Sequence, residues 1–276
     1  MNTTIVSLVS MGSLAALFAL GLAMAGRIFA VETDPKIDAI EEVLPGVNCG
    51  GCGFAGCRAF AEAVASGEAP TNGCPVGGAT VAQMVAAVLG VDAVAPVRKV
   101  AQVLCQGGNA EAKQKGTYDG PVDCRIAHAT QGGDKACSYG CLGYGSCVKA
   151  CAFDAMYMNE NGLPVVIEDN CTACGKCVEA CPRDIIILVP EDQGVHIRCR
   201  SLDTGRKVRQ VCSVGCIACQ RCVKVCPTGA IYMEDNLARI NYDKCTNCRE
   251  CVAVCPMKTI DWQDGKPLVL EKAAVS

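Results

Sequence analysis

The sequence predicts an α+β protein made of an N-terminal transmembrane helix, a small and mostly helical four-cysteine domain, and two tandem modules. Three observations carry this prediction: the first 26 residues hold no charged side chain, 24 of the 276 residues are cysteine, and two cysteine-rich segments repeat each other. The predicted boundaries are 1–28 for the anchor, 29–92 for the four-cysteine domain, 93–190 for the first module and 191–276 for the second.

The composition limits how such a chain folds. Aromatic residues make up 4% of it, with 5 Phe, 6 Tyr and 1 Trp, so there is little bulky material for a large core. Metal centres supply stability of another kind, because their binding energy becomes folding energy. Only 2 histidines are present, which limits zinc sites of the mixed Cys/His type. The formal net charge of -3 favours neither nucleic acid nor an anionic surface, and we expect no nucleic-acid partner.

Residues 5–25 form a run of 21 mostly apolar side chains, long enough to cross a bilayer core of about 30 Å. A cleaved signal peptide is the alternative, because residues 23–25 have the small-x-small pattern of a cleavage site. Against it, no basic residue precedes the run, and the run is longer than a typical signal core. Arg27 and Lys36 follow the helix, so the positive-inside rule predicts a single-pass protein of the cell membrane with cytoplasmic C-terminal domains. In that reducing compartment the cysteines indicate metal sites rather than disulfides.

The first cysteine set follows a short predicted helix that has Asp34 as its N-cap and Pro35 at its first position. Its spacing is C-x2-C-x4-C-x16-C-P, on a glycine-rich segment. Three close thiolates and one returning thiolate can surround a [4Fe–4S] cubane, and the glycines let the backbone approach the sulfurs. A zinc ion is the alternative, since four thiolates suit zinc as well. The candidate ligands are Cys49, Cys52, Cys57 and Cys74.

Three further runs have the spacing C-x2-C-x2-C-x3-C-P, which is highly specific for the [4Fe–4S] ferredoxin motif. They are Cys171, Cys174, Cys177 and Cys181; Cys216, Cys219, Cys222 and Cys226; and Cys245, Cys248, Cys251 and Cys255. In two-cluster ferredoxins the fourth cysteine of each run binds the cluster of the other run. The last two runs therefore predict one cluster on Cys216, Cys219, Cys222 and Cys255, and another on Cys245, Cys248, Cys251 and Cys226.

An internal repeat identifies the partner of the first of these runs. Residues 137–158 align with 212–233 without a gap, with 11 identities in 22 positions. The register continues upstream, where Cys124-Arg125 aligns with Cys199-Arg200. The chain is therefore predicted to hold two ferredoxin-like modules with two [4Fe–4S] sites each. In the first module, one site is predicted to consist of Cys151, Cys171, Cys174 and Cys177.

The other site of the first module lacks one expected cysteine, because Tyr144 aligns with Cys219. Cys141, Cys147 and Cys181 remain, and we predict that Cys137 supplies the fourth thiolate; an empty or three-iron site is the alternative. Four cysteines are then unassigned, which is the number that one more cubane needs. The sequence thus predicts five clusters, or six if these cysteines form a set rather than ordinary buried thiols: Cys105, Cys124, Cys199 and Cys212.

An uncharged N-terminal helix, the C-x2-C-x4-C-x16-C-P segment and the ferredoxin-type repeats together resemble the B-subunit family of the Rnf complexes, which are ion-translocating ferredoxin:NAD oxidoreductases. The resemblance implies a subunit that accepts electrons from reduced ferredoxin and passes them to the other subunits of the Rnf membrane complex. Those subunits carry flavin and further iron–sulfur centres, reduce NAD and translocate Na⁺ or H⁺. Shorter members of the family have a single two-cluster module, whereas two are predicted here.

The sequence agrees with that role in what it lacks. It contains no GxGxxG after a strand, no P-loop and no HExxH, so we expect no nucleotide site and no catalytic residue beyond the clusters. His128 and His196 are predicted to be surface or loop residues rather than metal ligands. Two other functions remain open: a free-standing membrane polyferredoxin without ion coupling, and a metal-storage or corrinoid-protein partner that docks through the four-cysteine domain.

A run of basic residues surrounds Cys199 and continues toward Cys212. Ferredoxins tend to be acidic, so a basic face is expected to speed their encounter by electrostatic steering. A solvated loop is the alternative interpretation. The residues are Arg198, Arg200, Arg206, Lys207 and Arg209.

Overall fold

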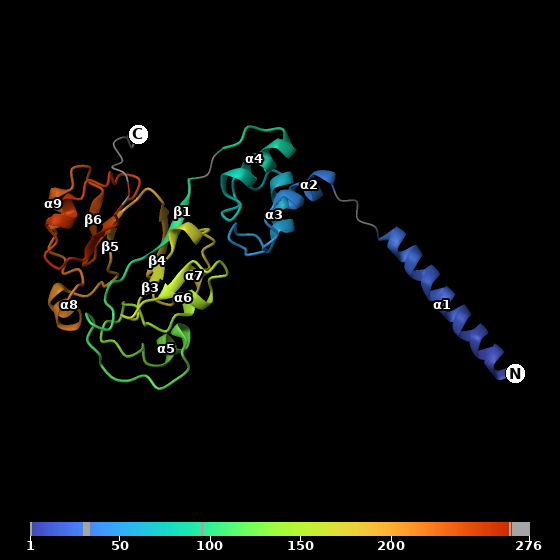
Figure 1. The fold of residues 1–276 in the computed structure, drawn as a ribbon, viewed down its shortest axis with the longest axis horizontal. Helices are drawn as coiled ribbons and strands as arrows, with labels where there is room; N and C mark the ends of the chain where they lie inside the picture. Colours follow the sequence, from blue (N-terminus) through green and yellow to red (C-terminus); the bar gives the residue numbers. More distant parts are fainter. Residues whose placement is uncertain (1, 30–33, 95–96, 265, 267–276) are drawn as a thin grey trace.

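The computed structural model describes residues 2–29, 34–94, 97–264 and 266 (Figure 1). Helix α1 (Asn2–Ile28) extends away from the rest of the chain. Its segment Ile5–Ile28 has a mean hydropathy of 2.2 and is long and apolar enough to cross a membrane. The side chains described along it are exposed almost throughout, as expected for a helix whose apolar surface is covered by lipid rather than by protein.

The four-cysteine domain is a small helical unit formed by α2 (Pro35–Val43), α3 (Cys57–Ala65) and α4 (Gly78–Leu89). Asp34 caps α2 as predicted, since its side chain accepts a hydrogen bond from the Lys36 N–H at 2.9 Å. The three helices enclose a core of Ile40, Phe60, Val64 and Val85.

The first module contains two antiparallel strand pairs and several short helices. Strand β1 (Lys99–Val103) pairs with β4 (Ile186–Pro190), and β2 (Met156–Met158) pairs with β3 (Pro164–Val166). Its apolar core includes cysteines, which indicates that the sulfur sites are part of the packed interior. The helices are α5 (Cys124–Thr130), α6 (Ser146–Lys149), α7 (Lys176–Glu179) and the 3₁₀ turn η1 (Glu168–Asn170).

The second module repeats this plan. Strand β5 (Val195–Ile197) pairs with β8 (Ile260–Trp262), and β6 (Ile231–Glu234) pairs with β7 (Leu237–Ile240). Helices α9 (Arg221–Val225) and α10 (Glu250–Ala253) take the places of α6 and α7, while α8 (Gly205–Val211) precedes the first cysteine run.

Upstream of the cysteine runs the two modules do not follow the register that the sequence alignment predicts. The strand of the first module that corresponds to β5 is β1, because each pairs with the last strand of its own module. Cys105 lies two residues after β1, and Cys199 lies two residues after β5. In space, therefore, Cys105 rather than Cys124 corresponds to Cys199. The first module therefore has an additional segment of 19 residues, 106–124, between Cys105 and Cys137.

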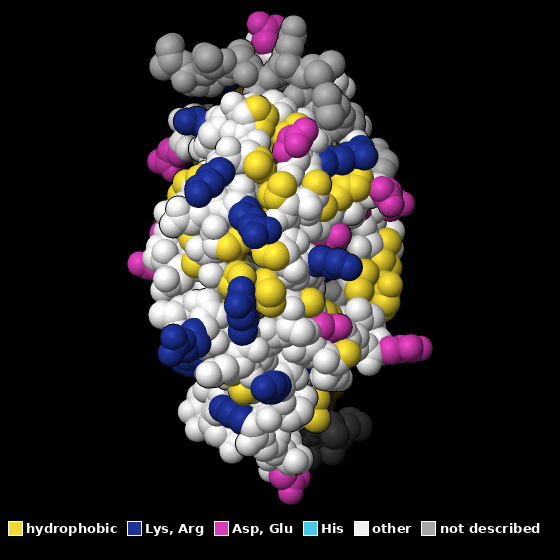
Figure 2. All heavy atoms as spheres, turned by 90° about the vertical axis from the view of Figure 1, so that its left-hand side faces the viewer, with side chains coloured by type: hydrophobic (Ala, Val, Ile, Leu, Met, Phe, Trp, Pro, Cys, Tyr) yellow, Lys and Arg dark blue, Asp and Glu magenta, His cyan; other side chains and the backbone are white. Residues whose placement is uncertain are grey.

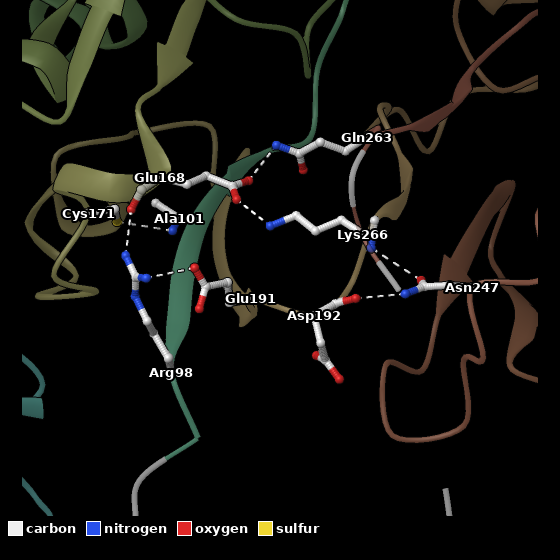
Figure 3. Close-up of polar contacts among 10 residues, drawn as sticks. Arg98, Ala101, Glu168, Cys171, Glu191, Asp192, Asn247, Gln263 and Lys266 are labelled. Carbon is white, nitrogen blue, oxygen red and sulfur yellow. Dashed lines mark hydrogen bonds and ion pairs between the residues drawn. The ribbon is translucent and has the colours of Figure 1, made fainter. Parts of the chain in front are cut away.

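Side chains close to Cys171, the first cysteine of the run 171–181, join the two modules (Figure 3). Glu168, at the start of η1, accepts hydrogen bonds from Gln263 and Lys266 of the second module. The Arg98 guanidinium bonds to the Glu168 carbonyl oxygen at 3.0 Å and forms an ion pair with Glu191 at 2.7 Å. The modules are thus fixed to each other at the edge where β1 begins.

The additional segment of the first module forms a second connection. The Lys113 N–H donates to the Val211 carbonyl oxygen at 2.9 Å, and the Ser213 N–H donates to the Glu111 carbonyl oxygen at 3.0 Å. These bonds flank Cys212, which itself forms a β-bridge with Ala112. The segment therefore holds residues 211–213 of the second module against the first module.

The four-cysteine domain touches the first module through a glycine. A Cβ atom at Gly51 would lie 2.9 Å from the Cα of Cys174 and 3.0 Å from its carbonyl oxygen, so only glycine permits this approach. Gly51 lies between Cys49 and Cys52. The cysteine loop of the domain is therefore in backbone contact with a cysteine loop of the first module.

Candidate metal centres

The four cysteines of the N-terminal domain line one pocket. Cys57 begins α3, and Asn48 fixes this start because its Oδ1 accepts a hydrogen bond from the Cys57 N–H at 2.7 Å. The Gly51 N–H donates to the Cys49 sulfur at 3.5 Å. The pocket holds the set that the spacing groups together: Cys49, Cys52, Cys57 and Cys74.

The second module contains two sets of thiols, and each takes its fourth cysteine from the other run. Cys216, Cys219, Cys222 and Cys255 line one pocket. In the other set, the Cys251 sulfur interacts electrostatically with Cys245, Cys248 and Cys226, and also with Cys222 of the first set. This crossed arrangement is the one that the two-cluster spacing predicts.

The cysteine loops have a left-handed backbone at alternate positions. In the second module these positions are Ala218, with φ 57°, and Gln220, with φ 60°. In the first module they are Gly143, with φ 86°, and Gly145, with φ 70°. Such turns direct successive N–H groups toward one point, where an anionic group is stabilised. The first module thus keeps the backbone of a cluster loop around Tyr144.

One set of the first module follows the predicted grouping. The Cys177 sulfur interacts electrostatically with Cys171, Cys174 and Cys151 of this set, and also with Cys147 of the other set. Burial, together with the charges of Cys171 and Cys174, raises the pKa of the Cys177 thiol to about 12. Four anionic sulfurs coexist there only with a cation between them. The Ala101 N–H of β1 donates to the Cys171 sulfur at 3.4 Å, a bond of the kind that tunes cluster potentials (Figure 3).

The other set of the first module corrects the sequence-based grouping. Cys141, Cys147 and Cys181 line a pocket whose fourth cysteine is Cys124, and Cys137 is not among its lining residues. The structure therefore places Cys124, rather than Cys137, in the position of the missing thiolate.

Helix α5 explains this position. It begins at Cys124, and the Asp123 side chain caps it by accepting hydrogen bonds from two of its N–H groups. The Cys124 N–H donates to the Ser146 hydroxyl at 2.8 Å, and that hydroxyl donates to Asp123 at 3.0 Å. Ser146 is the first residue of α6, and Cys147 follows it on that helix. These bonds therefore hold Cys124, at the start of α5, beside Cys147.

Tyr144 does not replace the cysteine as a ligand. Its hydroxyl donates to the Asp134 carboxylate at 2.9 Å, and its ring packs against Tyr118 with the centroids 5.3 Å apart. Burial, reinforced by the Asp134 hydrogen bond, raises the pKa of Tyr144 above its usual value. The phenol therefore stays protonated and is held by its neighbours.

The remaining thiols meet between the two modules. Cys105, Cys137, Cys199 and Cys212 line a single pocket, and we refer to them as the junction cysteines. The sequence-based grouping had Cys124 in this set in place of Cys137. With this exchange, four pockets each hold four cysteines, and the other eight of the 24 remain for two further sets.

The spacing of the thiols bears on the zinc alternative. Two ligands of one zinc ion lie within about 4.6 Å of each other, because each Zn–S bond is about 2.3 Å long. Within the described part of the chain, no three Cys, His, Asp or Glu side chains are arranged to hold a single metal ion. Four thiols around one pocket are the donor set that a [4Fe–4S] cubane binds.

Two other residues differ from expectation. Lys135, which no sequence motif singled out, is 4% exposed and donates from Nζ to the Gly107 carbonyl oxygen at 3.2 Å in the junction pocket. The one sequence signal for it is its place two residues before Cys137. His128 is exposed as predicted, whereas His196 is buried in β5 with its Nδ1 3.1 Å from the Tyr242 hydroxyl. The prediction of a surface or loop position is therefore wrong for His196, which is a buried strand residue.

The basic run divides into two parts. Arg198 and Arg200 line the junction pocket, whereas Arg206, Lys207 and Arg209 are exposed on α8. Figure 2 shows Lys and Arg side chains spread along the face that carries α8 and α9, with Asp and Glu mostly toward its margins. Cys219, which lies two residues before α9, is exposed. A positively charged surface thus adjoins the set of thiols nearest to solvent.

Comparison with known families agrees with these sites. Residues 44–76 match the family model of an Fe–S cluster domain, and residues 136–186 and 215–259 each match a 4Fe–4S dicluster domain. Fold and sites together define an iron–sulfur protein that carries several [4Fe–4S] centres and has one candidate membrane-spanning helix.

Full-length relatives specify the family. The chain is 47% identical over 245 residues to the B subunit of the Na⁺-translocating ferredoxin:NAD⁺ oxidoreductase complex of Acetobacterium woodii, covering 89% of this chain and 74% of that one. It is 48% identical over 246 residues to the B subunit of the proton-translocating complex of Clostridium ljungdahlii, covering 89% and 87%. It is 45% identical over 231 residues to the B subunit of the ion-translocating oxidoreductase complex of Methanosarcina acetivorans, covering 83% and 88%. The chain belongs to the B-subunit family of the Rnf ion-translocating oxidoreductase complexes.

Proposed function

We propose that this chain takes electrons from reduced ferredoxin and relays them through its [4Fe–4S] clusters to other subunits of an Rnf membrane complex. Those subunits reduce NAD⁺ and couple the electron flow to movement of Na⁺ or H⁺. The observation that carries the proposal is the series of four-cysteine sets that runs from the exposed Cys219 to the domain beside α1. Each cluster gains and loses one electron, and two electrons with one proton convert NAD⁺ to NADH.

We infer five clusters, and the matches to two dicluster domains and one Fe–S domain support this number. No bond to carbon is made or broken in this chain, so it needs no acid, base or nucleophile; its residues set the potentials through hydrogen bonds, charge and burial. We assign the ligands as Cys49, Cys52, Cys57 and Cys74; Cys124, Cys141, Cys147 and Cys181; Cys151, Cys171, Cys174 and Cys177; Cys216, Cys219, Cys222 and Cys255; and Cys226, Cys245, Cys248 and Cys251.

The order of the sites favours a path from the second module toward the membrane. Ferredoxin binds the basic face of α8 and α9, beside Cys219. The last site in the path is the four-cysteine domain, whose Gly51 contacts the loop of Cys174. Helix α1 anchors this end to the bilayer. Arg27 and Lys36 keep the cluster domains on the cytoplasmic side, where ferredoxin and NAD⁺ are found.

The experiment compares membranes that contain the full-length chain with membranes that contain a chain without residues 2–29. Only the full-length chain is expected to remain in the membrane, to co-purify in detergent with multi-span subunits, and to support NADH formation from reduced ferredoxin. A full-length chain that purifies alone and reduces another acceptor without ion movement would instead be a free-standing polyferredoxin.

The docking face has its own test. Charge reversal of Arg206, Lys207 and Arg209 to Glu is expected to slow ferredoxin oxidation about tenfold or more at low salt and little at high salt, because steering is screened by ions. The matched control reverses Lys99, Lys115 and Lys149, which are exposed on the first module and change the net charge equally. Equal rates for both variants would remove α8 from the docking site.

A further inference from the structure

We propose that the junction cysteines hold a sixth [4Fe–4S] cluster, which links the cluster sites of the first module to those of the second. The inference rests on the clusters proposed above, but it requires neither ferredoxin nor NAD⁺. Two ligands come from each module: Cys105 and Cys137 from the first, and Cys199 and Cys212 from the second. No cysteine-spacing motif joins them, since they come from four separate segments.

The junction cysteines occupy equivalent places in the two modules. Cys105 and Cys199 each follow the first strand of their module by two residues. Cys137 and Cys212 each lie four residues before the first cysteine of a run. The module repeat thus brings two pairs of equivalent thiols to one pocket where the modules meet, and supplies the four thiolates that a cubane binds.

Glycines bring the sulfurs close to each other. A Cβ atom at Gly107 would lie 3.1 Å from the Cys212 sulfur and 3.9 Å from the Cys105 sulfur. A Cβ atom at Gly140 would lie 3.4 Å from the Cys137 sulfur and 3.8 Å from the Cys105 sulfur. Sulfurs of both modules therefore surround the same small volume.

Backbone N–H groups point at these sulfurs, as they do at iron–sulfur sites. Cys105 accepts a hydrogen bond from the Cys141 N–H at 3.4 Å, and Cys199 accepts one from the Ser201 N–H at 3.4 Å. The Cys216 N–H also bonds to the Cys199 sulfur. Such donors stabilise thiolates, which are the form that binds iron.

The charge around the pocket distinguishes a metal site from a group of ordinary buried thiols. Lys135, Arg198 and Arg200 all line the pocket, and Lys135 is almost fully buried. Neutral thiols pack well in apolar surroundings and give no reason to bury an ammonium group. A four-thiolate cubane is anionic, so cations at its margin offset the cost of burying its charge.

The position of the site gives the cluster its role. Cys105 accepts its hydrogen bond from Cys141, a ligand of a first-module site, and Cys199 is bonded in the same way to Cys216, a ligand of a second-module site. The junction site is therefore bonded directly to one cluster site in each module. Electrons that arrive in the second module reach the first through it.

Iron content of the full chain, isolated anaerobically in detergent, tests the proposal. Six cubanes give about 24 Fe per chain and five give about 20. We expect Cys212→Ser to lower the content by about 4 Fe, with the other clusters intact by EPR and the secondary structure unchanged by circular dichroism.

Two double variants test the ligand set. If Cys137 and Cys212 share a cluster, the variant with both changed to Ser loses about 4 Fe, no more than either single variant. The variant with Cys124→Ser and Cys212→Ser loses about 8 Fe, because those residues serve different clusters. The opposite pattern would return Cys124 to the junction set and overturn the proposal.

The unsubstituted chain provides a measurement that does not depend on how the variants fold. An iron content near 20 per chain, with no loss in Cys212→Ser, would overturn the sixth cluster. Because the isolated chain is measured without partners, that result would leave the proposed function untouched. Failure of NADH formation in membranes would likewise leave the iron count unchanged.

Discussion

The first and second modules place the same cysteine motif on the same strand pairs, but they complete one site differently. In the second module Cys219 belongs to the loop before α9 and lines the pocket there. In the first module Tyr144 stands at the equivalent place and turns to Asp134. The fourth thiol then comes from Cys124, at the start of α5. The cysteine that is missing at position 144 is thus replaced by Cys124 of α5, and the second module has no helix at the corresponding place.

The difference shows that ligand positions follow strand pairing rather than the sequence alignment. Cys124 aligns with Cys199 without a gap, yet Cys105 occupies the place of Cys199 beside the equivalent strand. The additional segment 106–124, which ends with Cys124, accounts for the mismatch. Because of that segment, the first module has one cysteine more upstream of its runs than the second, and that extra cysteine compensates for Tyr144.

The largest expected effect follows from this substitution. Cys124→Ser should remove about 4 Fe, because the first-module site keeps only three thiolates. Adding Tyr144→Cys should restore iron, since the loop around position 144 keeps left-handed turns at Gly143 and Gly145, as the loop of Cys219 does at Ala218 and Gln220. Iron analysis and EPR on the anaerobically purified chain measure both steps.

The control for this rescue is Tyr144→Cys alone. It should leave the iron content unchanged, because the site already has four cysteines. Full iron content in Cys124→Ser, with no contribution from position 144, would show that Cys124 is not a ligand and would remove the comparison on which the prediction rests.

The cysteine spacing was sufficient to predict two dicluster regions and the meeting of Cys255 with Cys216, Cys219 and Cys222 at one pocket, because a cubane demands fixed separations along a loop. Asp34 as the cap of α2 was equally predictable, since capping depends on neighbouring residues. Cys137 was misplaced because its partners are set by contact between modules, which no local pattern encodes. Lys135 and His196 were missed for a related reason: both are buried by the way whole strands and segments pack.

The next effect concerns Gly51, which joins the four-cysteine domain to the first module. Gly51→Ala should weaken docking by about 1–3 kcal/mol, or roughly 5- to 150-fold in the docking equilibrium, because the added methyl group would overlap the Cys174 backbone. Hydrogen exchange of the loop around Cys174 should increase, and electron transfer to the N-terminal cluster should slow. Gly116→Ala, where a Cβ atom meets nothing within 4 Å, serves as the control.

Lys135 should have a smaller, purely electrostatic effect. Lys135→Met removes a buried positive charge beside the junction cysteines and should lower the potential of one cluster by tens of millivolts, because a cation stabilises the reduced and more negative state. A redox titration followed by EPR measures this shift. The equivalent residue of the second module, Gln210, is exposed, so Gln210→Met should leave every potential in place. Equal shifts in both variants would argue against a cluster beside Lys135.

The smallest effect is a pH dependence confined to the second module. Burial, reinforced by the charge of Arg198, lowers the pKa of His196 from 6.5 to about 4. Between these values the unfolded chain binds a proton that the folded chain does not, so stability is complete above pH 6.5 and falls as the pH drops toward 4. Opening of β5 should become easier by about 0.8 kcal/mol between pH 8 and pH 6.

Hydrogen exchange of the β5 amides, corrected for the intrinsic rate, measures this dependence. His196→Gln should abolish it, whereas β1, which occupies the equivalent place in the first module and has no histidine, should show none in either protein. A pH dependence of the same size in β1 would mean that both modules respond to acid through their clusters rather than through His196. The comparison between the modules therefore separates a titrating side chain from a general loss of iron.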